Sequence, residues 1–184
     1  MDRAQALTLM ESYLEADNLR KHCLASEAIM RALARRLNQD EEKWALAGLL
    51  HDLDYDQTKD EPTRHGLVTA AVLEEKGVDP EIIQAIKTHN AEALNLTRAT
   101  PLDLALTCAE VMTGMVVAAT LVHPDKKINS VNPKSILKRM KEKQFARGAR
   151  REHILLCENL GVPMADFAVL SLEAMAGIAG ELGL

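Results

Sequence analysis

Helix-start signals recur along this chain and constrain its fold more than any other feature. Three pairs join a capping side chain to a proline at the first helical position: Asp79-Pro80, Thr100-Pro101 and Asn132-Pro133. Asp2 and Asp40 can cap two further helices. Strand signals are missing, and aromatic residues, which favour strands, make up only 3% of the chain. The sequence therefore predicts an all-α fold.

Apolar residues at three- and four-residue spacing predict a compact bundle of about eight or nine helices. The expected ranges are roughly 3–16, 19–38 with Asn18 as its cap, 41–51, 65–76, 80–89, 102–122, a helix that begins at 133, 150–159 and 164–180. An acidic loop is expected over 52–64. Because the chain has neither a repeat nor a low-complexity linker, residues 1–184 are expected to form one domain.

Composition narrows the class of protein. Hydrophobic residues make up 47% and charged residues 27%, as in soluble globular proteins, and the net charge of -5 argues against a general nucleic-acid binder. Cys23, Cys108 and Cys157 form no CxxC motif, which predicts free thiols in a reducing compartment. We find no apolar run near the ~20 residues of a membrane span and no signal-type apolar segment, so a cytoplasmic protein without membrane association is expected.

Positive charge gathers in the segment 126–151. It holds ten Lys or Arg side chains and one acid, Glu142, so its charge is +9 and the remainder carries -14, which sums to -5. A solvated helix face is one interpretation. An anion site is the functional one, with Lys138 and Arg147 as candidates to bind a substrate phosphate. Nucleic-acid binding is a third, but the segment lacks interleaved aromatic residues for base stacking.

Two neighbouring residues of metal-ligand type end the apolar helix expected over 41–51. His51 and Asp52 follow the run Gly48-Leu49-Leu50. A neutral imidazole and a carboxylate are good ligands for a divalent metal, and both are costly to bury without one. A polar helix end that faces water is the simpler interpretation of an isolated pair. His123 and His153 lack any supporting context and are not taken as site residues.

Three further histidines and one acid lie in helical segments on either side of this pair. Considered one at a time, these histidines have simple interpretations. His22 is typical of a core histidine and His65 of an exposed residue, while His89 lies where a helix C-terminus favours a positive charge. Glu110 differs, because a lone carboxylate inside a long apolar helix is costly unless it is paired, bound to metal or facing a wet groove.

In order along the chain, these residues resemble the motifs of the HD superfamily of metal-dependent phosphohydrolases, in its compact single-domain form. His51 and Asp52 lie in AGLLHDLDY, His65 in RHGLVTAAVLEEKGV, and His89 in IIQAIKTHN. Glu110 lies in ALTCAEVMTG, where the family usually has Asp. The similarity covers roughly residues 18–125, and 126–184 is expected to form a C-terminal helical extension.

The resemblance implies that His22, His51, Asp52 and Glu110 converge on one metal. Nitrogen and oxygen ligands of this kind suit Mn, Fe, Co, Ni or Zn, and the sequence does not select among them. Glu110 is the departure from the family pattern, since it keeps the charge of Asp but adds a methylene.

Binuclear members of the family bind a second metal through the shared Asp and three further histidines. The matching positions here are His65, His89 and Asn90, and an amide is a poor ligand beside imidazole. One metal per chain is therefore expected, and a second, weaker metal site is the alternative. His65 and His89 are then expected to be catalytic, lining the cleft, binding phosphate and stabilising the leaving group.

The expected function is hydrolysis of a phosphoester of a nucleotide-like small molecule by a metal-activated water. Asp52, His65 and His89 are the expected catalytic residues, and an acid of the 52–64 loop is expected to orient the water. A non-catalytic module that senses a phosphorylated ligand is the first alternative. A di-iron oxygenase, known in the same superfamily, is the second. Exposed apolar faces on the last helices favour a homodimer.

Overall fold

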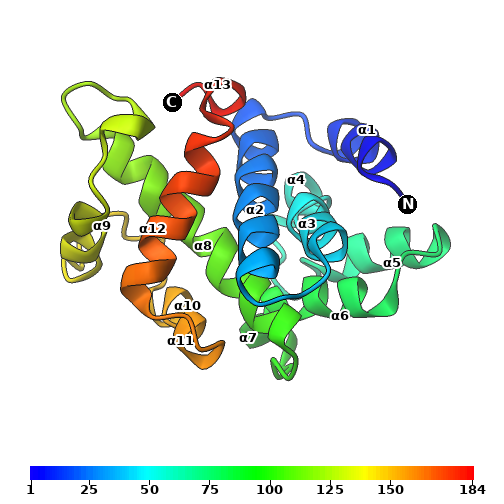
Figure 1. The fold of residues 1–184 in the computed structure, drawn as a ribbon. Coiled ribbons are helices and arrows are strands. Elements are labelled where there is room, and N and C mark those ends of the chain that lie inside the picture. The colour runs from blue at the N-terminus through cyan, green and yellow to red at the C-terminus, as the bar shows by residue number, and fades with distance from the viewer.

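The computed structural model describes all residues 1–184 and contains helices and loops but no strand, which confirms the all-α prediction (Figure 1). Eight helices are longer than one turn and five have four residues each. The helices are α1 (Arg3–Tyr13), α2 (Asp17–Arg36), α3 (Glu41–Leu50), α4 (Tyr55–Thr58), α5 (Leu67–Glu75), α6 (Pro80–His89), α7 (Ala91–Leu94), α8 (Pro101–Leu121), the 3-10 helix η1 (Ile128–Ser130), α9 (Pro133–Met140), α10 (Arg151–Ile154), α11 (Leu156–Asn159), α12 (Met164–Ala176) and α13 (Ala179–Leu182).

The expected capping residues begin their helices. Side-chain oxygens of Asp2, Asp40, Asp79, Thr100 and Asn132 accept hydrogen bonds from backbone N–H groups in the first turns of α1, α3, α6, α8 and α9. These bonds satisfy donors that the helix itself leaves unpaired. Local chemistry therefore fixes where these five helices start.

Several predicted boundaries are wrong. Asn18 does not cap α2, because the helix begins at Asp17, two residues before the expected start, with Ala16 as its cap. The helix expected to open at His65 begins at Leu67, after Gly66 adopts the left-handed conformation at φ 86°. The helix expected over 150–159 is divided into α10 and α11, and the last one ends at Ala176. The expected loop over 52–64 also contains α4.

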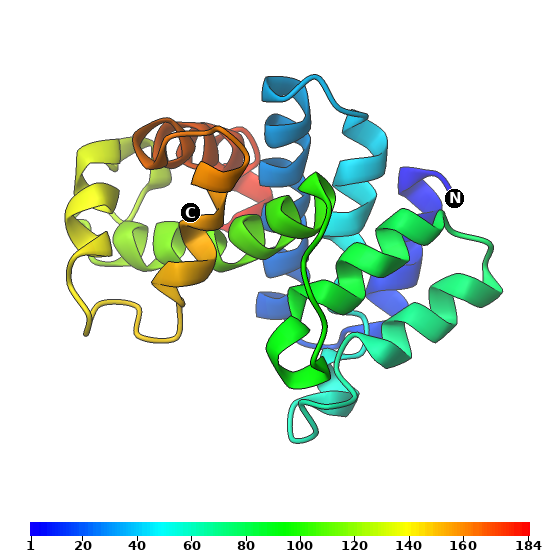
Figure 2. The same cartoon turned by 90° about the horizontal axis from the view of Figure 1, so that it is seen from below.

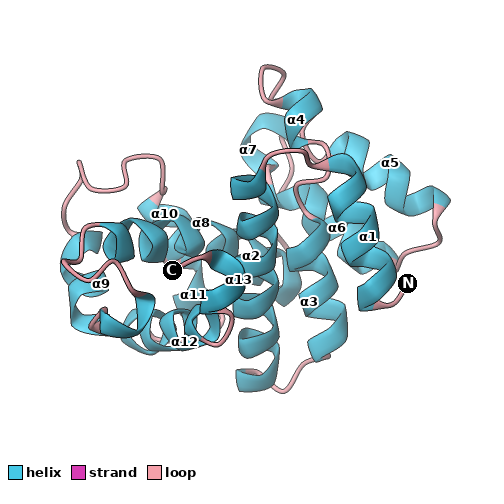
Figure 3. Ribbon diagram, turned by 90° about the horizontal axis from the view of Figure 1, so that it is seen from above, coloured by secondary structure: helices cyan, strands magenta, loops and turns pink.

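Helix α8 lies at the centre of the fold and packs against α2, α6, α9, α10, α11 and α12 (Figure 1). One cluster of 43 buried apolar residues extends from Ala6 to Leu182. Helix α2 separates α1 and α3–α6 from α9–α13 (Figure 3). An irregular loop joins α9 to α10 at the edge of the molecule (Figure 2). The division into 18–125 and 126–184 stays a prediction.

The expectation that no apolar run has the length of a membrane span is wrong. Helix α8 is long and apolar enough to cross a membrane, and 61% of its most apolar window is buried inside the fold. A second candidate arises only if Arg151–Asn159 and Met164–Ala176, bent by 106°, count as one span. A buried core helix of a soluble protein meets the same criteria.

A close contact between α2 and α3 brings two site histidines together. A Cβ added at Gly48 would lie 2.8 Å from backbone atoms of Ser26 and Glu27, which is closer than real Cβ atoms come. Only glycine allows this approach of the two backbones. The contact sets His51, which follows the last residue of α3, against His22 on α2.

Candidate metal centre

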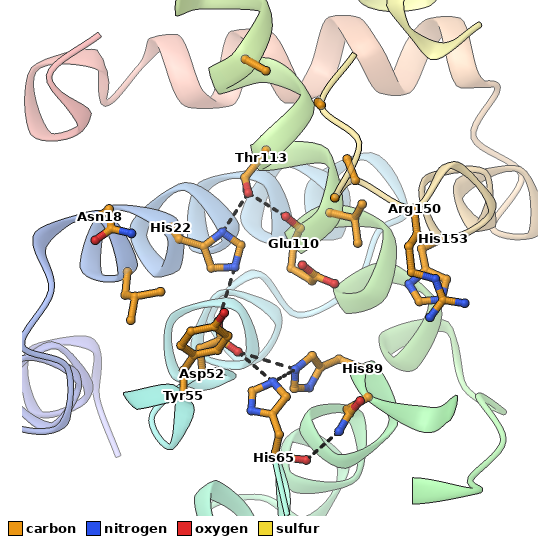
Figure 4. A pocket seen from close by; sticks show the side chains of 18 of the residues that line it. Asn18, His22, Asp52, Tyr55, His65, His89, Glu110, Thr113, Arg150 and His153 are labelled. Atoms are coloured by element: carbon orange, nitrogen blue, oxygen red, sulfur yellow. Dashed lines mark hydrogen bonds and ion pairs between the residues drawn. The ribbon is translucent and has the colours of Figure 1, made fainter. Parts of the chain in front are cut away.

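Four imidazoles from four parts of the chain surround the carboxylate of Asp52. Figure 4 shows three of them, His22, His65 and His89. The Nε2 atoms of His22 and His51 lie 3.6 and 3.5 Å from Asp52 Oδ2. The Nε2 atoms of His65 and His89 lie 3.3 and 3.6 Å from Asp52 Oδ1. Two groups of three possible metal ligands result, and they share Asp52.

The spacing of these atoms fits divalent metal ions. Metal bonds of 2.0–2.2 Å at angles between square and tetrahedral place neighbouring ligand atoms roughly 2.8–3.6 Å apart. The two Nε2 atoms are 3.1 Å apart in the pair His22 and His51, and 2.9 Å apart in the pair His65 and His89. Together with the distances to Asp52, every separation lies within that range. Each group can therefore hold one ion without rearrangement.

The second ring nitrogen of His51 and of His89 fixes the tautomer. Nδ1 of His51 donates to the carbonyl oxygen of Gly48 at 2.8 Å, and Nδ1 of His89 donates to the carbonyl of Ile86. A carbonyl accepts only, so Nδ1 carries the proton in both rings. Their Nε2 atoms then present lone pairs toward Asp52, as metal binding requires.

Thr113 fixes His22 in the same way. The hydroxyl of Thr113 donates to the carbonyl of Glu110 at 2.6 Å, so its oxygen is left to accept from His22 Nδ1 at 2.9 Å (Figure 4). Helix α8 thus orients a ligand that belongs to α2. This arrangement directs the lone pair of His22 Nε2 toward Asp52.

His65 is oriented by a buried carboxylate. Asp54 Oδ1 accepts from His65 Nδ1 at 2.9 Å, while Oδ2 accepts from the backbone N–H groups of Gly66 and Thr69 at 2.8 and 3.0 Å. Asp54 is fully buried, and these three bonds use its acceptor capacity on both oxygens. A carboxylate behind a ligating histidine raises the basicity of that ligand.

The charges of the cluster shift several pKa values. Burial opposes ionisation of Asp52, but the surrounding imidazoles outweigh it and hold its pKa well below the usual range. Burial lowers the pKa of His51 to about 3, so the ring is neutral at pH 7. Burial also lowers the pKa of His65, but hydrogen bonds to Asp52 and Asp54 raise it to about 10. Burial and the charge of Asp52 raise the pKa of Glu110 to about 8.

A pocket of about 730 Å³ opens over the cluster. Its lining includes Asp52, Glu110 and the loop 146–150 between α9 and α10. Arg150 and His153 lie on the far side of Glu110 from His22 (Figure 4). Pockets of this size hold small organic ligands. The metal groups therefore face a space large enough for a substrate.

The structure brings five of the predicted site residues into one cluster: His22, His51, Asp52, His65 and His89. Glu110 lines the pocket but belongs to neither group of possible ligands, and its role as a ligand stays a prediction. Arg147 also lines the pocket. Lys138 is exposed on α9 and lies outside the pocket lining.

A second group of possible metal ligands lies beside the first. The second group consists of Asp52, His65 and His89 and does not need a third histidine. Asn90 instead donates from Nδ2 to the carbonyls of Pro62 and His65, at 2.7 and 3.1 Å. The number of bound metals stays a prediction.

Sequence reasoning missed a charged network at the rim of the pocket. His153, set aside for lack of context, is buried and its Nε2 lies 3.1 Å from Oε1 of Glu92. Arg98 binds the same carboxylate through both terminal nitrogens, and Arg150 lies 3.6 Å from it. Arg98 also donates to the carbonyl of His89, so the network touches the metal cluster. The basic run over 126–151 was the only sequence signal near these residues.

Comparison with known proteins agrees with this geometry. The sequence model described as HD domain matches residues 19–113, which is 95 of the 184 residues. HD domains are generally metal-dependent phosphohydrolases, and the His/Asp cluster can hold a metal. No solved structure matches the chain. The matched range contains all five residues of the two ligand groups. The chain belongs to the HD domain family.

Proposed function

We propose that this protein hydrolyses a phosphoester of a nucleotide-like small molecule with two divalent metal ions, which His22, His51, Asp52, His65 and His89 would hold. One observation carries the proposal. Four imidazoles keep their Nδ1 atoms bonded to acceptors and direct their Nε2 atoms to the two oxygens of one carboxylate. Burial keeps the rings of His22 and His51 neutral, so without metal their Nε2 lone pairs would face each other at 3.1 Å, which is unfavourable in a buried site.

The residues of the cluster suit phosphoester hydrolysis. A divalent ion held there would lower the pKa of a bound water toward ~7 and polarise a phosphoryl oxygen. Asp52 offers one oxygen to each group and keeps both at a fixed separation. Asp54 and Thr113 hold the histidines in the tautomer that leaves Nε2 free.

Arg147 is the proposed cation for a substrate phosphate. It lines the pocket and makes no ion pair, whereas the guanidinium of Arg150 lies beside the carboxylates of Glu92 and Glu152. An arginine without an acidic partner keeps its donors for a phosphate, which it can bind through two parallel hydrogen bonds. Lys138 does not line the pocket, so its position does not support a role in phosphate binding.

Two alternative functions predict different experimental results. A sensor module would bind metal and a phosphorylated ligand without turnover. A di-iron oxygenase gains support from the two bridged ligand groups, since the lack of a third histidine no longer counts against it. It would show visible absorbance after iron loading and would consume oxygen.

Metal analysis of chelator-free protein is the first test, with Asp52→Ala as the variant and Asp60→Ala as the control. Asp60 is an exposed acid of the same loop. We expect close to two metals per chain in the parent and in the control, and strong loss of both in Asp52→Ala. With Mn, Co, Ni or Zn, the parent and the control should hydrolyse phosphoesters, and Asp52→Ala should lose this activity. No metal in the parent after reloading would refute the proposal.

A further inference from the structure

Gly114 occupies the interior of α8, where no packing contact requires a glycine. Glycine is the least favourable residue in a helix interior after proline. A Cβ added at Gly114 would meet no atom within 4 Å, in contrast to Gly48, where it would strike the backbone of α2. Gly114 also does not adopt a positive φ. Neither neighbouring atoms nor backbone conformation explains this residue.

The open space beside Gly114 belongs to the pocket over the metal cluster. Gly114 lines that pocket together with Glu110 and Ala118, one helical turn away on either side. Residues spaced by four share one face of a helix, so these three form a continuous floor. At 1.5 Å per residue, the floor extends ~12 Å along α8. The polar end lies at Glu110 and the end with the smallest side chains at Gly114 and Ala118.

The remaining lining supplies apolar surface that a phosphate group does not need. Leu19 and Val111 line the pocket, as does Tyr55, whose side chain is exposed although it is aromatic. An exposed aromatic ring beside a pocket offers a face on which a planar organic group can stack. The pocket thus combines a polar end for the reacting phosphate with room and apolar surface for an attached group.

We propose that the substrate is an extended phosphoester whose organic part, of nucleoside size, lies along α8 over Gly114. This inference rests on the proposed function for the position of the phosphate. In it, Gly114 determines specificity by leaving space, so that a larger side chain would exclude the organic part and spare the phosphate end. Compact phosphoesters would then be poor substrates.

The test compares Gly114→Leu with Gly180→Leu. A Cβ at Gly180 also meets no atom within 4 Å, and Gly180 lies outside the pocket, so it is a matched control. Calorimetry on manganese-loaded protein would measure the binding of adenosine 5′-monophosphate and of inorganic phosphate. We expect the parent to bind the nucleotide at least tenfold more tightly than phosphate. Gly114→Leu should weaken nucleotide binding at least tenfold and change phosphate binding less than twofold.

Stability and metal content show whether the variant is intact. Leucine has a higher helix propensity than glycine, so the melting temperature of Gly114→Leu should be unchanged or higher. Its metal content should equal that of the parent. A parent that binds the nucleotide no better than phosphate, or a variant that weakens both probes equally, would overturn the inference. A change of oligomeric state on substitution would also overturn it, since a second chain would then fill the space.

Measuring the hydrolysis of nucleotides by the parent and by Gly114→Leu distinguishes a failure of this inference from a failure of the proposed function. Selective loss of nucleotide binding without any hydrolysis by the parent would support the extended ligand and refute the hydrolase. Hydrolysis of nucleotides that Gly114→Leu leaves unchanged would support the hydrolase and refute the role of Gly114.

Discussion

Replacing Asp54 by asparagine tests whether the carboxylate behind His65 controls metal binding. Asn keeps the shape of Asp but has one acceptor oxygen instead of two. The backbone N–H groups of Gly66 and Thr69 both need that oxygen, because buried donors without partners are costly. The amide NH2 would then face Nδ1 of His65. This favours the tautomer with the proton on Nε2, which cannot bind a metal.

The expected magnitudes follow from the bonds that are lost. Loss of a residue that orients a metal ligand typically costs 10–100-fold in metal affinity. That loss equals about 1.4–2.7 kcal/mol and should fall on the group formed by Asp52, His65 and His89. The lost charge-assisted hydrogen bond of 2.9 Å should lower stability by about 1.5–3 kcal/mol. For a chain of this size the melting temperature should drop by roughly 3–12 °C.

Calorimetric titration of metal-free protein with Mn or Zn measures both sites. We expect two binding steps for the parent and for an Asp60→Asn control, and one retained step for Asp54→Asn. His22 and His51 make no contact with Asp54, so the retained step should keep its affinity. Equal weakening of both steps, or two unchanged steps, would show that the tautomer argument is wrong.

Three further substitutions test other parts of the structure. Gly48→Ala should destabilise the fold by about 1–3 kcal/mol, because α2 and α3 must move apart, and thermal unfolding beside Gly180→Ala checks this. Arg147→Gln should lower kcat/KM for a phosphoester about tenfold, while Lys138→Gln leaves it unchanged, and steady-state kinetics measures both. The guanidinium of Arg98 lowers the pKa of Glu92 in the folded protein from 4.5 to about 2. This ion pair therefore stabilises the fold above pH 4.5, and the stabilisation is lost as the pH falls toward 2. Glu92→Gln should lower the melting temperature by roughly 2–4 °C at pH 7, as for an exposed ion pair, and should leave it unchanged near pH 2.

Local signals explain how much of the fold could be predicted. A capping side chain acts within one helical turn, so Asp40, Asp79 and Thr100 mark their helix starts in the sequence. The start of α5 could not be found in this way. It depends on Gly66 at φ 86° and on a hydrogen bond from its N–H to Asp54, twelve residues earlier. A contact of that range leaves no local pattern.

The same distinction holds for the site. His51 and Asp52 are neighbours in the sequence and belong to a family motif, so the core of the site could be predicted. His153 reaches the pocket only because α10 packs against α8, and its partner Glu92 is 61 residues away. Thr113 orients His22 across 91 residues. Such pairs arise from tertiary packing, which periodicity and composition do not encode.

Asn90 shows that the chemical type of a residue is not enough to decide its role at a metal site of this kind. At the position of a family ligand, an amide looks like a loss of metal binding. In the folded chain its Nδ2 donates to the carbonyls of Pro62 and His65, and so ties the end of the 52–64 loop to the C-terminus of α6. An imidazole has only one N–H donor at each ring nitrogen and could not hold both carbonyls from one atom. Asn90 therefore favours the metal group beside it, since it fixes the backbone of His65 while Asp54 fixes its ring.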